Sequence, residues 1–135
     1  MTELKHTHQL VLIQGELKAP KGQTNKFGGY SYRSAEDILE AVKPLLQKHN
    51  SDLTLSDEIV EVGGRVYVKA TARLVSHNPF AEVETTAFAR EAEVKKGMDD
   101  AQITGSASSY ARKYALNGLF CIDDTKDPDA TNTHG

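Results

Sequence analysis

The chain has 135 residues, of which 39% are hydrophobic and 26% charged, values that are usual for one globular domain with a sizeable core. It contains no apolar run near the ~20 residues that cross a bilayer and no recognisable secretory signal. The single cysteine, Cys121, excludes an internal disulfide and the usual zinc ligand sets. We therefore expect an intracellular protein that does not enter the membrane.

The net charge of −3 is concentrated at the C-terminal end. Residues 123–135 contain four aspartates and one lysine, so residues 1–122 are neutral. A neutral domain can still carry a basic stripe that binds nucleic acid. The sequence predicts a single domain over residues 1–122, followed by a polar, acidic tail over residues 123–135 that we expect to be disordered.

Apolar residues at helical spacing predict two helices in the N-terminal part of the chain. The first covers residues 3–18, with an apolar side that includes Val11 and Leu12 and is widened by Leu10 and Ile13. A loop is expected over residues 23–32. The second helix follows the N-cap residue Ser34 and reaches about His49.

Three strands and a last helix follow. Residues 53–62, 65–76 and 80–90 are predicted strands, and Gly63-Gly64 fits a two-residue hairpin turn that needs positive φ. The helix starts at Asp99 or Asp100 and ends at about Asn117, with Gly118 as the residue after its cap. The order α-α-β-β-β-α predicts an α+β fold, in which a three-stranded antiparallel meander packs against helices.

The last predicted helix has two unlike sides at 100° per residue. The side that we expect to bury against the sheet, with Leu116 as an exception, holds Ile103, Ala107, Tyr110, Ala111 and Tyr114. The opposite side holds Gly105, Ser108, Ser109, Arg112 and Lys113. Two cations beside small hydroxyl side chains suit the phosphates of a nucleic acid backbone. The alternative is a solvated helix end whose cations favour the helix dipole.

A second candidate site lies on the predicted central strand. Its polar side carries three cations and one aromatic ring, formed by Arg65, Tyr67, Lys69 and Arg73. Cations can follow the phosphates of a single strand while a ring stacks on a base. The alternative is an ordinary exposed strand face protected by charged side chains. Glu82 and Glu84 would neutralise part of this row if they lie opposite it.

A third candidate is the loop before the second helix, which contains Lys26, Phe27, Tyr30, Tyr32 and Arg33. The rings have two interpretations: they stack on bases, or they pack as a lid over the core, which is the favoured one. Lys26 and Arg33 are the expected nucleic-acid contacts.

The sequence contains no recognisable catalytic or nucleotide-binding pattern. It lacks a Ser/His/Asp set, a P-loop and a G-x-G-x-x-G stretch. Asp123, Asp124, Asp127 and Asp129 lack the glycine and glutamate spacing of a calcium-binding loop. We therefore expect no enzyme activity, no bound metal and no cofactor, ATP included.

Four stretches of the chain form a recognisable set. They are Lys18-Ala-Pro-Lys21, Phe27-Gly-Gly-Tyr-Ser-Tyr-Arg33, Leu39-Glu-Ala-Val-Lys-Pro-Leu-Leu46 and, followed by Asp123-Asp124, the long stretch Gly105-Ser-Ala-Ser-Ser-Tyr-Ala-Arg-Lys-Tyr-Ala-Leu-Asn-Gly-Leu-Phe120. In these stretches the chain resembles the ERF (essential recombination function) family of phage single-strand annealing proteins. The resemblance covers residues 3–127, and the last stretch is the most specific.

The resemblance implies the β-β-β-α core of single-strand annealing ring proteins and an ATP-independent protein that binds and anneals single-stranded DNA in phage homologous recombination. It also implies a homo-oligomer, as a ring or filament, in the host cytoplasm. Its working partner would be a host single-strand-binding protein or a phage exonuclease. Three alternatives remain open: a module that protects single-stranded DNA without annealing it, a metal-dependent nuclease that uses the tail carboxylates, and an interaction domain that binds no DNA.

Overall fold

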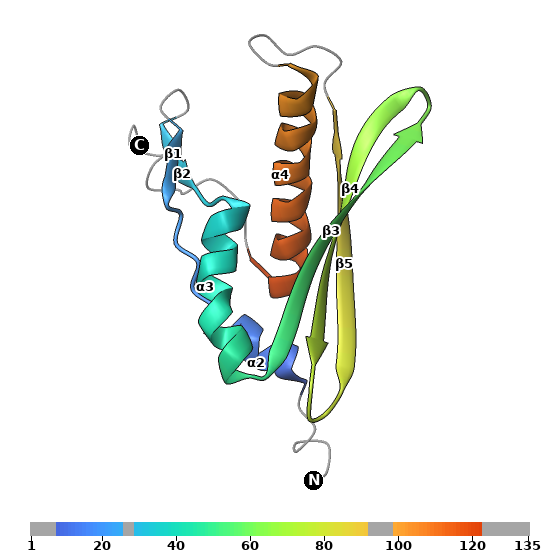
Figure 1. The fold of residues 1–135 in the computed structure, drawn as a ribbon. Coiled ribbons are helices and arrows are strands. Elements are labelled where there is room, and N and C mark those ends of the chain that lie inside the picture. Colours follow the sequence, from blue (N-terminus) through green and yellow to red (C-terminus); the bar gives the residue numbers. More distant parts are fainter. Residues whose placement is uncertain (1–7, 26–28, 92–98, 123–135) are drawn as a thin grey trace.

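The computed structural model describes residues 8–25, 29–91 and 99–122 (Figure 1). With the labels of Figure 1, the elements are α2 (Gln9–Glu16), β1 (Gln23–Asn25), β2 (Tyr30–Tyr32), α3 (Ala35–Lys48), β3 (Ser51–Val62), β4 (Arg65–Ser76), β5 (Ala81–Arg90) and α4 (Asp100–Phe120). This order confirms the predicted α+β class and its three-stranded meander. The expected loop over residues 23–32 is wrong, because β1 and β2 pair there as an antiparallel hairpin.

The large sheet has the order β3-β4-β5 and is antiparallel throughout. Gly63 and Gly64 join β3 to β4 with φ values of 58° and 79°, the positive values that the predicted two-residue turn requires. Pairing of Val62 with Arg65 on either side of this turn sets the register of the whole hairpin.

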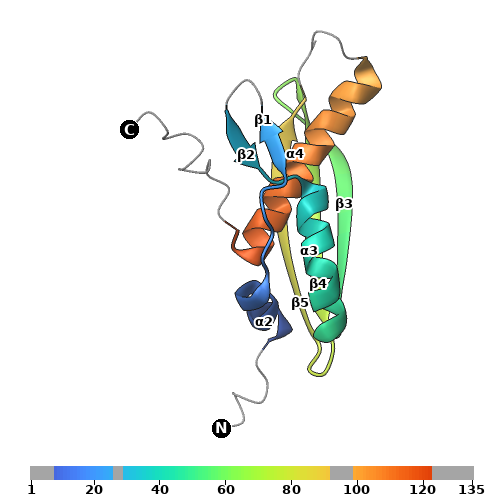
Figure 2. The ribbon, with the colours of Figure 1, turned by 90° about the vertical axis from the view of Figure 1, so that its left-hand side faces the viewer.

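Only one face of this sheet is covered by the described elements. In Figures 1 and 2 the three helices and the β1–β2 hairpin all lie on the same side, which we call the inner face. The inner residues of β4 are fully buried and small or branched: Val68, Ala70, Ala72 and Leu74. The opposite, outer face carries the alternate residues of all three strands, from Arg65 and Tyr67 to Arg73 on β4.

Small side chains bring α4 close to the sheet. Ala107, Ala111 and Ala115 are buried at four-residue steps along the helix and belong to the same core cluster as Ala70 and Ala72 of β4. Alanine on both sides of a helix–sheet contact allows the two backbones to approach closely. The larger core side chains around these alanines then fill the remaining space between the helix and the sheet. Thr85 of β5 adds a hydrogen bond from its Oγ1 to the carbonyl of Ala115, at 2.7 Å.

The C-terminal end of α4 differs from the prediction. The helix continues through Gly118 to Phe120, and Cys121 rather than Gly118 takes the left-handed conformation, with φ of 58°. Leu119 and Phe120 are almost completely buried, as is Leu116, the residue that did not fit the predicted pattern. Burial of these three side chains extends the helix two residues beyond Gly118, because packing outweighs the local helix propensity.

The first described helix, α2, is shorter than predicted and packs through a different side. It covers Gln9–Glu16, whereas residues 3–7 of the predicted helix lie outside the described part of the chain. Leu10 and Ile13 are its buried residues, and Val11 and Leu12 are exposed. The prediction of the packing side was wrong because the apolar residues lie almost all round this helix. Its sequence alone therefore could not identify the side that packs.

The start of α3 is fixed by a capping box, as the N-cap prediction implied. The Ser34 hydroxyl accepts a hydrogen bond from the Asp37 backbone N–H, and the Asp37 carboxylate accepts one from the Ser34 N–H at 2.9 Å. This bond from the Ser34 backbone lowers the pKa of Asp37 below its usual value.

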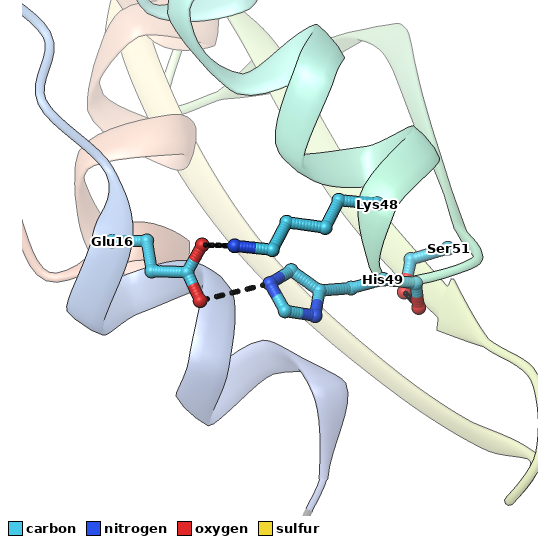
Figure 3. A network of polar contacts seen from close by, with 4 residues as sticks. All are labelled: Glu16, Lys48, His49 and Ser51. Carbon is cyan, nitrogen blue, oxygen red and sulfur yellow. Dashed lines mark hydrogen bonds and ion pairs between the residues drawn. The ribbon is translucent and has the colours of Figure 1, made fainter.

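A polar network joins α2 to the C-terminal end of α3 (Figure 3). The two carboxylate oxygens of Glu16 lie 2.9 Å from Lys48 Nζ and 3.1 Å from His49 Nε2. These bonds, the one from Lys48 first, lower the pKa of Glu16 below its usual value of 4.5. The network therefore favours an ionised Glu16 and holds α2 against α3.

This network leads to a pH-dependent prediction for Glu16→Gln. Because the pKa of Glu16 is lowered in the folded state, ionised Glu16 stabilises the protein fully above about pH 4.5, and this contribution is lost as the pH falls through the lower folded pKa. The variant should therefore be less stable than wild type at neutral pH and equally stable in acid, as measured by urea denaturation at a series of pH values. Glu61→Gln, at the exposed end of β3, is the control. A difference that is the same at every pH would contradict the role of this network.

Candidate nucleic-acid interface

Two tyrosines that the sequence predicted to be buried lie instead on the surface of α4. Tyr110 is 53% exposed and Tyr114 is 48% exposed. The buried residues of the helix recur every four positions, at Ile103, Ala107 and Ala111. The tyrosines lie outside this row, on the exposed part of the helix. Two aromatic rings one helical turn apart are thus available to a ligand.

Lys113 lies between two aromatic rings. Its Nζ is 5.5 Å from the centroid of the Tyr32 ring on β2 and 5.7 Å from that of Tyr114. Both distances are within the range of cation–π interactions. We call Tyr32, Tyr110, Lys113 and Tyr114 the tyrosine–lysine cluster. It joins α4 to the β1–β2 hairpin and combines a cation with three rings on a partly exposed surface.

The other predicted residues of α4 divide between two environments. Ser108 Oγ donates a hydrogen bond of 2.5 Å to the Asp57 carboxylate on β3, and Arg112 Nε donates to the same carboxylate at 3.1 Å. Arg112 retains 41% of its side-chain exposure in this ion pair. Ser109 is exposed. A serine hydroxyl and a guanidinium that converge on one carboxylate are also the donors that a phosphate group accepts.

The row predicted on β4 lies on the outer face, on the opposite side of the sheet from α4. Arg73 forms an ion pair with Glu82 and lies opposite Glu84 in the register, so the two glutamates neutralise part of this row, a point that the sequence left open. Lys69 lies opposite Glu58 and 6.0 Å from the ring centroid of Phe88. The row and the α4 residues therefore cannot contact one short stretch of ligand together.

The loop candidates are only partly described. Arg33 donates a hydrogen bond from Nε to the carbonyl of Ala19, at 2.8 Å, and is half-buried, so it ties the segment after β2 to the segment after α2. Lys26 and Phe27 lie outside the described residues. Tyr32 is half-buried, and Lys113 lies over its ring. The ring is therefore partly packed, as expected of a lid, and partly exposed, as base stacking requires.

Asn117 lies one turn beyond Tyr114 on α4 and is buried without a hydrogen bond. It is 7% exposed, and neither its Oδ1 nor its Nδ2 has a partner among the described residues. An unpaired buried amide costs about 1–3 kcal/mol. Asn117→Leu replaces it with an apolar group of similar size, so we expect the free energy of unfolding in urea to rise by about this amount. A destabilised variant would show that the amide is paired in solution.

Over residues 8–25, 29–91 and 99–122, no three His, Cys, Asp or Glu side chains lie together as a potential metal site. The carboxylates of the predicted acidic tail lie outside these ranges. No helix among the described residues is both long and apolar enough to span a membrane.

Comparisons with known proteins agree with the motifs of the sequence. The model of the ERF superfamily matches residues 7–135. Over 125 residues the chain is 58% identical to the Essential recombination function protein of Salmonella phage P22, a match that covers 90% of this chain and 57% of the phage protein. The chain thus spans little more than half the length of this relative. No solved structure is significantly similar to it. Because the family match extends over nearly all of its residues, the chain belongs to the ERF superfamily.

Proposed function

We propose that this chain binds single-stranded DNA and anneals complementary strands, without ATP and without catalysis, in phage homologous recombination. Membership of the ERF superfamily and similarity to a phage protein named for an essential recombination function support the recombination role. The observation that carries the DNA-binding role is the exposed tyrosine–lysine cluster on α4. Rings and cations side by side are the usual means of binding a single strand without sequence preference.

The chemistry of this surface determines what it can do. Tyr110 and Tyr114 stack on successive bases, while Lys113 and Arg112 neutralise phosphates on either side of them. Gly105 and Ser109 leave space for a backbone to approach the helix. A strand held in this way keeps its base-pairing edges accessible, and a second strand then samples registers until pairing and stacking, at about 1.4 kcal/mol per step, fix the duplex.

Assembly follows from the same proposal. Copies of the chain in a ring or filament set their α4 surfaces in series and extend one DNA strand over many subunits. The protein acts in the host cytoplasm beside a host single-strand-binding protein or a phage exonuclease.

The direct experiment is a fluorescence-quench annealing assay with complementary oligonucleotides in the absence of ATP, alongside light scattering to determine the mass of the particles. We expect the chain to form oligomers and to accelerate pairing, with non-complementary oligonucleotides as the control. A folded, oligomeric sample that binds single strands but leaves the pairing rate unchanged would contradict annealing. That result would favour the alternative of a module that only protects single-stranded DNA.

Asp57 provides a further prediction of this proposal. Its carboxylate accepts hydrogen bonds from the Ser108 hydroxyl and from Nε of Arg112, and its negative charge repels a phosphate bound beside them, so Asp57→Asn should raise the affinity for single-stranded DNA several-fold. Asp52→Asn, which removes a carboxylate from the ion pair with His77, is the matched control. Unchanged or weaker binding by a folded Asp57→Asn variant would show that Asp57 only positions α4.

A further inference from the structure

The outer face of the large sheet is open and has a regular pattern of charge. None of the described helices covers it (Figure 1). Phe88, near its centre, is 54% exposed. Most two-layer folds leave an antiparallel sheet with one solvated face, but such a face normally alternates charges of both signs along its length.

Here the charges are separated into two halves. Ser56, Thr71 and Thr86 lie opposite one another in the register and form a neutral row across the middle of the sheet. The half toward the β3–β4 turn, which we call the basic half, has three cations and one carboxylate: Arg65, Lys69, Arg90 and Glu58. The half toward the β4–β5 turn, the acidic half, has one cation and three carboxylates: Arg73, Asp52, Glu82 and Glu84.

We propose that this outer face binds the outer face of a second copy of the chain, with the strands of the two copies antiparallel. A two-fold axis along the row of Ser56, Thr71 and Thr86 lays each basic half over the partner's acidic half. The contact is then isologous and self-complementary. A parallel arrangement would oppose like charges and is therefore disfavoured.

The size and composition of the face define the kind of contact. Twelve-residue strands at 3.3 Å per residue and three strands at 4.8 Å spacing give a face of about 570 Å². A standard stable interface buries about 800 Å² per partner. The apolar groups of the face are few and spread along it, with Phe88 near the centre and Val62 at the β3–β4 turn. The contact is therefore weak, depends on concentration, and is loosened by salt because its charges are exposed.

A single DNA strand fits this face less well than a second copy. The three carboxylates of the acidic half repel phosphates, and Arg73 is already paired with Glu82. Only the basic half could hold a backbone, over half the length of the sheet. The proposed contact is independent of the DNA-binding role of α4, which lies on the other side of the sheet.

Charge reversal in the full chain tests the proposal by sedimentation velocity over a range of protein concentrations. Glu82→Lys with Glu84→Lys makes the face basic throughout, and Lys69→Glu with Arg90→Glu makes it acidic. Each variant alone should lose the concentration-dependent association, with at least a ten-fold rise in its dissociation constant. An equimolar mixture should recover it. Association of either variant as in wild type, or a mixture that recovers nothing, would overturn the proposal.

Cross-linking tests the orientation of the two copies. Position 71 lies on the proposed axis. In a Cys121→Ser background, the cysteine of a Thr71→Cys variant should therefore be linked by a short bismaleimide to the same cysteine in the second copy of the chain. Val62→Cys is more exposed but lies six residues from the neutral row, or about 20 Å at 3.3 Å per residue, and should not be joined. Efficient linkage at Val62→Cys without linkage at Thr71→Cys would overturn the antiparallel arrangement. If Lys69→Glu with Arg90→Glu loses single-stranded DNA binding while wild type shows no association through this face, the surface binds DNA and the proposal is wrong.

Discussion

Replacement of Tyr110 and Tyr114 by alanine should weaken binding of single-stranded DNA about thirty-fold or more. Stacking of a base on an aromatic ring contributes ~1–3 kcal/mol, and both rings are exposed on α4 without a role in the core. Because neither side chain is buried, the variant should unfold at nearly the wild-type temperature. Fluorescence anisotropy with a labelled oligothymidine measures the affinity.

The control for this experiment is the Tyr110→Phe, Tyr114→Phe variant, which keeps both rings and removes both hydroxyl groups. It should bind DNA nearly as tightly as wild type, because stacking requires the ring face. If the alanine and phenylalanine variants lose the same affinity, the hydroxyls rather than the rings carry the contact. If neither loses affinity, α4 is not the surface that binds bases.

The second large effect is expected for the Arg112→Ala, Lys113→Ala variant. Loss of two phosphate contacts should lower the slope of log affinity against log salt by about 1.4, or about 0.7 for each contact with a single strand. The affinity at low salt should fall strongly, whereas at high salt the two proteins should bind more alike. Equilibrium titrations at several salt concentrations measure both quantities.

A matched control separates a local contact from a general change of charge. The Lys18→Ala, Lys43→Ala variant removes the same net charge from exposed positions away from α4. Its salt slope should stay close to that of wild type. Equal slopes for the two double variants would show that Arg112 and Lys113 act only through the overall charge of the protein.

The strands were predictable because alternation is a local property. Residues 65–76 were bounded correctly, since a buried antiparallel strand alternates strictly and its turn glycines take positive φ. The buried side of α4 was predicted only in part: Ala107 and Ala111 are buried as expected, but Tyr110 and Tyr114 are not. Tyrosine counts as apolar in a helical pattern although its ring can remain at the surface. The four-residue spacing of Ile103, Ala107 and Ala111 was the signal in the sequence that marks the true buried side.

The contacts that define the candidate site connect distant parts of the chain. Arg112 and Asp57 are separated by 55 residues, and their ion pair depends on which inner position of β3 lies beside α4. Lys113 and Tyr32 meet only because the β1–β2 hairpin, which was expected to be a loop, stands against the helix. The residue types of this surface could be read from the sequence. The neighbours that each side chain contacts depend on tertiary packing and could not.

Photo-cross-linking tests most directly whether α4 holds the DNA. A single-stranded oligonucleotide containing 4-thiothymidine is irradiated in complex with the full chain, and the linked peptide is identified by mass spectrometry. The proposed interface predicts linkage to the α4 segment that contains Tyr110 and Tyr114, and loss of this linkage when both are alanine. Linkage confined to Tyr67 or Phe88, on the outer face of the sheet, would contradict it.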